Sequence, residues 1–281
     1  MSIMKKLREY LNRPLSFVMF LLIIISTVIT ALTVVFIIGY IFIKGVPNLS
    51  LDLFSLKYSS SNQSMLPSII NTGYLTALTL LLSVPIGIFS AIYLAEYSRK
   101  NSFFVKIINI ANETLSGIPS IVYGLFGFLA FVISKKWGYS LLAGVITLAI
   151  MVLPLIIRTS QEAMLGVDNT FREASYGLGA GKLRTVFKIV LPSAMPGILS
   201  GIILAIGRIV GETAALIYTA GTVPEAATKL TSSSRTISVH LYCLLNEGLY
   251  TEQAYATAVV LIVFVVIINA LSNALAKKIM K

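Results

Sequence analysis

Residues 17–43 read FVMFLLIIISTVITALTVVFIIGYIFI, and this stretch decides the fold because it holds no charged side chain. A helix needs about 20 apolar residues to cross the hydrocarbon core of a bilayer, and this run supplies them. The run is too long for the apolar core of a signal peptide, and no clear cleavage site follows it. We therefore expect a retained helix that spans a membrane.

Five further apolar runs extend this expectation to six spans. They cover residues 69–95, about 115–134, 139–157, 195–220 and 256–276. The alternative is a soluble protein with buried core helices. It is disfavoured because 57% of the residues are apolar and only 12% are charged, which is too few charges for a solvated surface. The sequence predicts an all-α integral membrane protein with six transmembrane helices.

The third of these runs has the least defined boundaries. Gly117 and Pro119 interrupt its start, and the charge-free stretch from Leu115 is barely long enough to cross a bilayer. Residues 103–110 either extend this span or form a separate interfacial helix.

The distribution of basic residues predicts the orientation of the spans. With six spans both termini lie on one side, and most of the 22 Lys and Arg residues fall on that side. We therefore expect both termini in the cytoplasm and a multi-pass protein of the cytoplasmic (inner or plasma) membrane. The net charge of +11 then reflects topology, so nucleic acid is not an expected partner.

The same pattern divides the chain into four parts. A cytoplasmic N-terminal tail (1–16) precedes the first transmembrane helix with an external loop (17–68). A membrane core follows (69–276), with a cytoplasmic loop at about 158–194, and the C-terminal tail is again cytoplasmic (277–281).

The sequence does not have the groups that an enzyme of the common classes needs. One cysteine and one histidine exclude an internal disulfide and a Cys/His metal cluster, so we expect no metal site. Gly181-Lys182 matches the end of a phosphate-binding loop, but Leu183 follows where such a loop has Ser or Thr. We therefore expect no ATP site of this type, no catalytic residue and no cofactor in this chain.

The loop before the fifth span has an unusual pattern. Asp168, Asn169 or Thr170 can cap a helix that begins near Phe171. Glycines at 177, 179 and 181 then end that helix and permit positive φ, and a second amphipathic stretch follows at 182–191. A short exposed helix on a turn suits docking of another protein. The residues alone favour the plainer alternative of a basic amphipathic connector.

This loop resembles the EAA motif of ABC importer permeases. Glu173-Ala174-Ser175, then Gly179, then Ile189-x-Leu191-Pro192 match the spacing of that motif, with Ser175 in place of its second Ala. Residues 117–127 and 207–215 are similar to the PstA family of phosphate-uptake permeases. The resemblance covers about residues 70–276, including further similar stretches at 157–163, 234–237 and 256–269.

The resemblance implies a type I ABC importer permease fold and ATP-driven import of inorganic phosphate. It implies a PstC-like permease as the partner in a heterodimer, an ATPase dimer that binds ATP with magnesium, and an external phosphate-binding protein. The loop helix would be the coupling helix that seats in a groove of the ATPase. The residues expected to couple are Arg172, Glu173, Ala174, Ser175, Gly179, Leu191 and Pro192.

Arg208 and Glu212 carry the prediction about the substrate path. They lie four residues apart in the fifth apolar run, so on one helix they would share a face. A charge in mid-bilayer costs about 2.5–3.5 kcal/mol on insertion scales, which calls for a partner or for water. The two can pair and only lock the packing, or they can line the path. The resemblance favours the path, where a guanidinium suits phosphate oxygens and Glu212 would keep Arg208 from holding the anion too tightly.

Two rival functions remain open at this point. One is an ABC importer permease for another oxyanion, such as molybdate or sulfate, although the Arg208/Glu212 pair and residues 117–119 favour phosphate. The other is a secondary transporter or channel without an ATPase. The EAA-like loop argues against it, as does the lack of a repeat relating two halves of the chain.

Overall fold

The computed structural model describes residues 14–98 and 102–279 of the chain. These residues form helices and no strand, which confirms the all-α prediction. Seven of the basic residues counted for the orientation lie outside the described residues, namely Lys5, Lys6, Arg8, Arg13, Arg99, Lys100 and Lys281.

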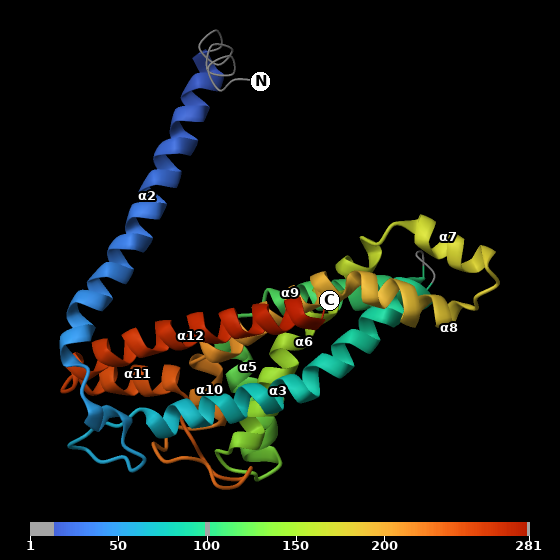
Figure 1. The fold of residues 1–281 in the computed structure, drawn as a ribbon. Coiled ribbons are helices and arrows are strands. Elements are labelled where there is room, and N and C mark those ends of the chain that lie inside the picture. Colours follow the sequence, from blue (N-terminus) through green and yellow to red (C-terminus); the bar gives the residue numbers. More distant parts are fainter. Residues whose placement is uncertain (1–13, 99–101, 280–281) are drawn as a thin grey trace.

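Five helical segments of the described chain are long and apolar enough to cross a membrane (Figure 1). They are Leu15–Asn48, Leu66–Tyr97, Leu141–Leu165, Lys182–Val210 and Thr251–Lys278. Their main helices are α2 (Pro14–Gly45), α3 (Leu66–Ile92), α6 (Leu141–Leu165), α9 (Leu191–Val210) and α12 (Thr251–Ile279). A sixth span is available if a bent pair of helices counts as one, which agrees with the predicted number.

The bent pair lies where the sequence left the third span undefined. It consists of α4 (Phe103–Ser116) and of α5 (Ser120–Gly127) with the π-helical turn η4 (Phe128–Ser134), and its two halves meet at 101°. Pro119 stands at the corner, where its ring fixes φ and restricts the residue before it. The Tyr123 hydroxyl donates to the Leu115 carbonyl at 2.8 Å and closes the corner. A sharp bend thus divides α4 from α5, and the pair makes the sixth span only if its two halves cross the membrane as one.

The core of the bundle surrounds α6. Leu148, Met151, Val152 and Ile156 of this helix are at least 98% buried, and α3 and α9 pack along it. At Gly201 of α9 an added Cβ would lie within 2.0 Å of the Thr159 hydroxyl of α6. A glycine is required for this approach, in keeping with the small residues that membrane helices place at their contacts.

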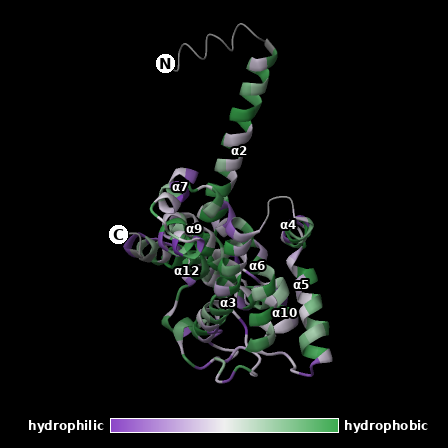
Figure 2. Cartoon of the chain, turned by 90° about the vertical axis from the view of Figure 1, so that its right-hand side faces the viewer, coloured by the Kyte–Doolittle hydropathy of each residue, from purple (hydrophilic) through white to green (hydrophobic). Residues whose placement is uncertain are grey.

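Helix α2 stands away from the bundle over most of its length (Figure 1). Only its end packs on the start of α12, where the Tyr40 and Tyr255 rings meet with centroids 5.9 Å apart. Hydrophobic residues predominate along the helix (Figure 2), and its most apolar stretch is not buried against the rest of the described chain. A helix of this kind needs lipid or a protein partner around it.

The fifth span differs from the apolar run at 195–220. The helical segment begins earlier, with α8 (Lys182–Thr185) and the π-helical turn η5 (Val186–Val190) leading without a gap into α9. It also ends earlier, because the chain leaves the helix at residues 211–213 before the short helix α10 (Ala214–Thr219). Thr213 has φ −124° and ψ −54°, outside the α region.

The bundle has two distinct ends (Figure 1). One end carries α7 (Asn169–Gly177) and α8, and the C-terminal end of α12 extends toward it. The other carries the 3-10 turns η1 (Val46–Asn48) and η2 (Leu51–Phe54) and the helix α11 (Ile237–Glu247). At this second end the Asn71 side chain bonds the backbone of Glu225, Ala227 and Arg235, which holds the loop at 221–236 on α3.

Candidate functional site

Asp168 starts the helix α7 as its N-cap. Its Oδ1 accepts from the Thr170 backbone N–H and from the Thr170 hydroxyl, both at 2.9 Å. These hydrogen bonds lower the pKa of the Asp168 carboxyl, so the group stays ionised where a negative charge favours a helix N-terminus. Of the three residues expected to cap, Asp168 does so, and the helix begins at Asn169.

Gly179 ends α7 in a left-handed conformation, with φ 80°. The Ala180 N–H donates to the Ser175 carbonyl at 3.1 Å and the Gly179 N–H to the Tyr176 carbonyl at 2.9 Å. This pair of bonds is the Schellman motif, whose left-handed position favours glycine. The expectation of positive φ is confirmed for Gly179 and wrong for Gly177 and Gly181, which lie in α7 and before α8 with negative φ.

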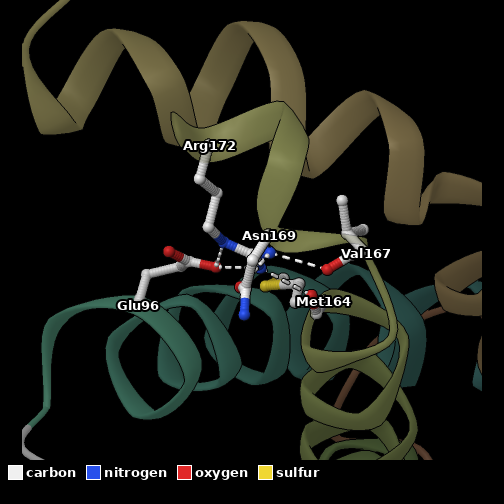
Figure 3. A network of polar contacts seen from close by, with 5 residues as sticks. All are labelled: Glu96, Met164, Val167, Asn169 and Arg172. Atoms are coloured by element: carbon white, nitrogen blue, oxygen red, sulfur yellow. Dashed lines mark hydrogen bonds and ion pairs between the residues drawn. The ribbon is translucent and has the colours of Figure 1, made fainter. Parts of the chain in front are cut away.

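Arg172 points from α7 into the bundle (Figure 3). Its Nε and Nη2 donate to Glu96 Oε1 at 3.1 and 2.6 Å. Nη1 donates to the Val167 carbonyl at 2.7 Å and to Asn169 Oδ1 at 3.3 Å, and Nη2 also donates to the Met164 carbonyl at 2.8 Å. A guanidinium has five N–H donors, so none remains free for another molecule.

Ser175 lies on the same inward face of α7. The residue is 96% buried, and its hydroxyl is 2.8 Å from the Thr185 hydroxyl of α8. The one departure from the EAA motif therefore makes a hydrogen bond that alanine could not make.

Other side chains of α7 and its C-cap are exposed and largely apolar. Phe171, Tyr176 and Leu178 are 55%, 43% and 89% exposed, and Glu173 and Ala174 lie beside them. Large apolar side chains left exposed on a short helix suit docking of another protein. Next to them a hollow of about 370 Å³ opens between α7 and η5, and its lining includes the basic side chains Arg184 and Lys188.

Apart from Gly179, which ends α7, the residues expected to couple fall into three groups. Glu173 and Ala174 face outward, whereas Arg172 and Ser175 face inward. Leu191 packs on the apolar cluster of α6, η5 and α9, and Pro192 is exposed in the first turn of α9, where proline is favoured. The inward direction of Arg172 and its partner Glu96, a residue without an expected role, were missed by the sequence analysis.

Glu212 lies outside the helix that carries Arg208, so the prediction that the two share a helix face is wrong. Helix α9 ends at Val210, and Glu212 lies in the break after it. Glu212 Oε1 accepts from the Ala215 N–H at 3.0 Å, at the start of α10. Among the residues that the structure describes, no ion pair joins the two side chains. The helix break thus leaves this carboxylate bonded to a backbone N–H and not to Arg208.

Arg208 instead lines a groove of about 620 Å³ between α9 and α12. No protein group in the described part of the chain hydrogen-bonds its guanidinium. Three uncharged polar side chains share the groove, and sequence analysis missed them. The amides of Asn269 and Asn273, four apart in an apolar helix, were a usable signal, because amides are costly at membrane depth. The lining residues are Leu155, Ser200, Ile203, Leu204, Gly207, Arg208, Asn269 and Asn273.

The groove has the chemistry to hold an anion for a short time. The free guanidinium offers paired donors that match the oxygens of an oxyanion. The amides and the hydroxyl add neutral donors without a second positive charge. Such a set binds an anion without trapping it, which suits passage.

Comparison with known proteins agrees with this geometry. Residues 83–281 match the family described as binding-protein-dependent transport system inner membrane component. The probable ABC transporter permease protein YqgI of Bacillus subtilis (strain 168) is 32% identical over 82% of this chain and 84% of the relative. The phosphate transport system permease protein PstA of Yersinia pestis is 34% identical over 84% of this chain and 81% of the relative.

Solved structures show the same fold. A chain of a bacterial ABC transporter that imports alginate aligns with a TM-score of 0.67, over 99% of this chain and all of that chain, at 18% identity. A chain of the MetNI methionine ABC transporter aligns with a TM-score of 0.58, over 76% of this chain and 94% of that chain, at 16% identity. The expected type I ABC importer permease fold is thereby confirmed.

Proposed function

This chain belongs to the family of binding-protein-dependent transport system inner membrane components, and from that membership we propose that it is a permease subunit of an ATP-driven importer of inorganic phosphate. Several relatives at 34–36% identity are phosphate transport system permease proteins. The single observation that carries the proposal is the free guanidinium of Arg208 in the groove between α9 and α12.

The proposed orientation places the α7 end of the bundle in the cytoplasm. Lys182, Arg184 and Lys188 lie in α8 and η5, which follow α7, and Lys277 and Lys278 lie in the last turn of α12, toward the same end. Basic residues of this density favour the cytoplasmic side of a membrane. The end with α11 then faces outward, and the N-terminus is cytoplasmic like the C-terminus.

The proposed partners fit the exposed surfaces at the two ends. A separate ATPase dimer, which binds ATP with magnesium, would seat the outward face of α7 and the hollow beside it. The basic Arg184 and Lys188 of that hollow suit acidic side chains on the ATPase. A PstC-like permease would complete a heterodimer, and a phosphate-binding protein would deliver its ligand at the α11 end.

In this proposal the anion meets Arg208 first and the neutral donors after it. The guanidinium replaces part of the water around phosphate, and its donors are available because nothing in the described chain occupies them. Ser200, Asn269 and Asn273 then offer weaker hydrogen bonds along the groove. Glu212 leaves Arg208 unpaired, so the charge that attracts the anion is not cancelled.

Access would alternate between the two sides as the ATPase dimer closes and opens. Closure moves α7, and the break at residues 211–213 gives the fifth span a place to bend. This chain performs no hydrolysis, and it converts the movement of its partner into a change of access.

The experiment is labelled phosphate uptake by cells that lack other phosphate carriers. We expect Arg208→Met to reduce uptake at least about tenfold, since the charge that meets the anion is lost. Arg208→Lys should also impair uptake, because a point ammonium cannot copy the planar fork. Co-purification with the ATPase confirms assembly, and Arg158→Met is the matched control because Arg158 is an exposed arginine of α6. Near-normal uptake by an assembled Arg208→Met complex would contradict the proposal.

A further inference from the structure

Glu96 lies where the second span ends, and its burial is unusual for a charged residue. It belongs to the π-helical turn η3 (Tyr93–Tyr97), which closes with a bond from the Ser98 N–H to the Tyr93 carbonyl. Its side chain is 6% exposed, and that of its partner Arg172 is 13% exposed. Two charges withdrawn from water lose hydration that their attraction repays only in good geometry. The burial of such a pair at the edge of the bundle therefore calls for a functional explanation.

The pair joins three elements through one side chain. Arg172 sits on α7, its carboxylate partner sits at the end of α3, and its carbonyl acceptors Met164 and Val167 lie where α6 ends. The last carbonyls of a helix lack partners within it, and the helix dipole favours a cation there. The guanidinium therefore holds α7 in a fixed position relative to both α3 and α6.

A second contact from the same loop reaches the same turn. The Lys182 ammonium of α8 lies over the Tyr97 ring, 4.9 Å from its centroid, at the distance of a cation–π interaction. In the described part of the chain, the hydrogen bonds between α7 and the helices α3 and α6 are all made by Arg172. The loop thus holds the turn η3 through Glu96 and through its neighbour Tyr97.

A competing route for movement runs through apolar packing. Ile92 of α3 and Val186 and Val190 of η5 belong to one buried cluster. Apolar contacts resist compression but yield when two surfaces are drawn apart, whereas an ion pair with several hydrogen bonds resists both. The two routes therefore predict different results when the charges are removed and the apolar cluster is kept.

We propose that the Glu96–Arg172 pair is the joint through which movement of α7 reaches α3. The two are positioning residues, since Arg172 has no donor left for the ATPase or the anion. This inference rests on the proposed function, because the movement originates in the partner ATPase. It assigns α3 as the span that follows the coupling helix.

The test uses the complete complex in proteoliposomes and measures phosphate molecules imported per ATP hydrolysed. Glu96→Leu combined with Arg172→Met replaces the buried pair by apolar groups of similar size, an exchange that folded proteins often tolerate. We expect the ATPase to co-purify and to hydrolyse ATP. The ratio of phosphate to ATP should fall at least about tenfold, within the range of ordinary coupling energies. A merely structural role would lower the yield of complex and leave the ratio unchanged.

The chain offers a matched control in its exposed Arg–Glu pair. Arg158 and Glu162 of α6 are joined at 3.0 Å, with side chains 57% and 63% exposed. Arg158→Met with Glu162→Leu removes the same two charges and should keep the ratio within about twofold of the unchanged complex. A ratio within that range for the Glu96→Leu/Arg172→Met complex would overturn the inference.

Two further outcomes are also decisive. If the double variant does not assemble, Glu96→Gln keeps the size of the side chain and removes its charge, and a normal ratio for that variant would overturn the inference equally. If the unchanged complex and the Arg158/Glu162 control both fail to import phosphate, the proposed function is overturned and the joint with it. Loss confined to the Glu96 and Arg172 variants supports the joint.

Discussion

Two arginines of this chain have the same chemistry and opposite surroundings. The N–H groups of Arg172 all donate hydrogen bonds, to Glu96, to an asparagine and to two backbone carbonyls. Arg208 lines a groove, and no group of the described chain hydrogen-bonds it. A buried polar group that is satisfied holds structure, whereas one left free in a groove is available to a ligand. In the function proposed above, Arg172 belongs to the end that transmits movement and Arg208 to the part that meets the anion.

The backbone also differs between the two regions, since it is a capped helix in one and an interrupted helix in the other. Helix α7 is closed at both ends, by the Asp168 cap and by the Schellman motif at Gly179. The fifth span is interrupted beside Arg208, and Glu212 bonds the start of the helix that follows. A coupled movement requires one part that keeps its shape and one that changes. The capped helix α7 suits the first role, and the interrupted fifth span suits the second.

The largest expected effects come from truncating each arginine. Arg172→Ala leaves the buried Glu96 charge without a partner, which costs about 3–5 kcal/mol, so the Tm of the purified complex should fall clearly. Arg208→Ala should lower the Tm little and should reduce phosphate uptake at least about tenfold. Thermal unfolding and labelled uptake are measured on both variants. The Tm should fall mainly in Arg172→Ala, and Arg208→Ala should lose uptake with little change in Tm. An equal loss of Tm in the two variants would erase the distinction between them.

The next effect concerns the shape of α7 and of the turn that ends it. Gly179→Trp forces a side chain into the left-handed region, at a cost of about 1–2 kcal/mol, and adds bulk on the docking face. We expect the subunit to insert and to lose uptake. Gly177→Ala is the control, because Gly177 is helical and an added Cβ there meets no atom within 4 Å. Normal uptake with Gly179→Trp would show that α7 does not dock.

A smaller effect is expected in the groove. Asn269→Leu and Asn273→Leu each remove a neutral donor worth about 1 kcal/mol, which corresponds to about a fivefold loss of uptake. Ala274→Leu adds the same side chain next to Asn273, at an exposed position that does not line the groove, and should leave uptake unchanged. Equal losses in all three variants would point to helix packing instead of a path for the anion.

The smallest effect is expected at the start of α7. Asp168→Ala should raise hydrogen exchange of the first α7 amides a few-fold, and Asp168→Asn should not, because asparagine also caps. The lowered pKa of Asp168 means that its contribution is present above the ordinary aspartate value of about 3.9 and is lost only as the pH falls through the folded value. Exchange of these amides should therefore not reflect Asp168 titration between about pH 5 and pH 8. A transition within that window that disappears in Asp168→Asn would contradict this assignment.

Sequence reasoning succeeded where one strong local signal decides the result. Apolar runs predicted the spans because a bilayer demands them. The ends of α7 were predicted to within three residues, as a cap at 168–170 and glycines at 177, 179 and 181, and the structure selects Asp168 and Gly179. Sequence reasoning failed where the direction of a side chain depends on a partner far away in the sequence. Nothing near Arg172 indicates that it turns inward, because its partner Glu96 is supplied by the end of another span.

The end of the fifth span was predicted wrongly for a different reason. Its apolar run continues to residue 220 without a charge after Glu212, so periodicity alone predicts one helix. The break at residues 211–213 depends on groups outside that run, such as the Ser238 hydroxyl, which donates to the Glu212 carbonyl at 2.6 Å. The groove asparagines were visible in the sequence but could not be assigned to a side of α12 without the neighbouring helix α9.

The central claim is that this chain carries phosphate at the expense of ATP, and accumulation in proteoliposomes tests it most directly. The purified complex of both permeases and the ATPase is supplied with the external binding protein, and labelled phosphate, sulfate and molybdate are compared. The account predicts that phosphate accumulates only when ATP and the binding protein are both present, and that the other two anions do not. Accumulation of sulfate or molybdate in preference to phosphate, or of phosphate without ATP, would contradict it.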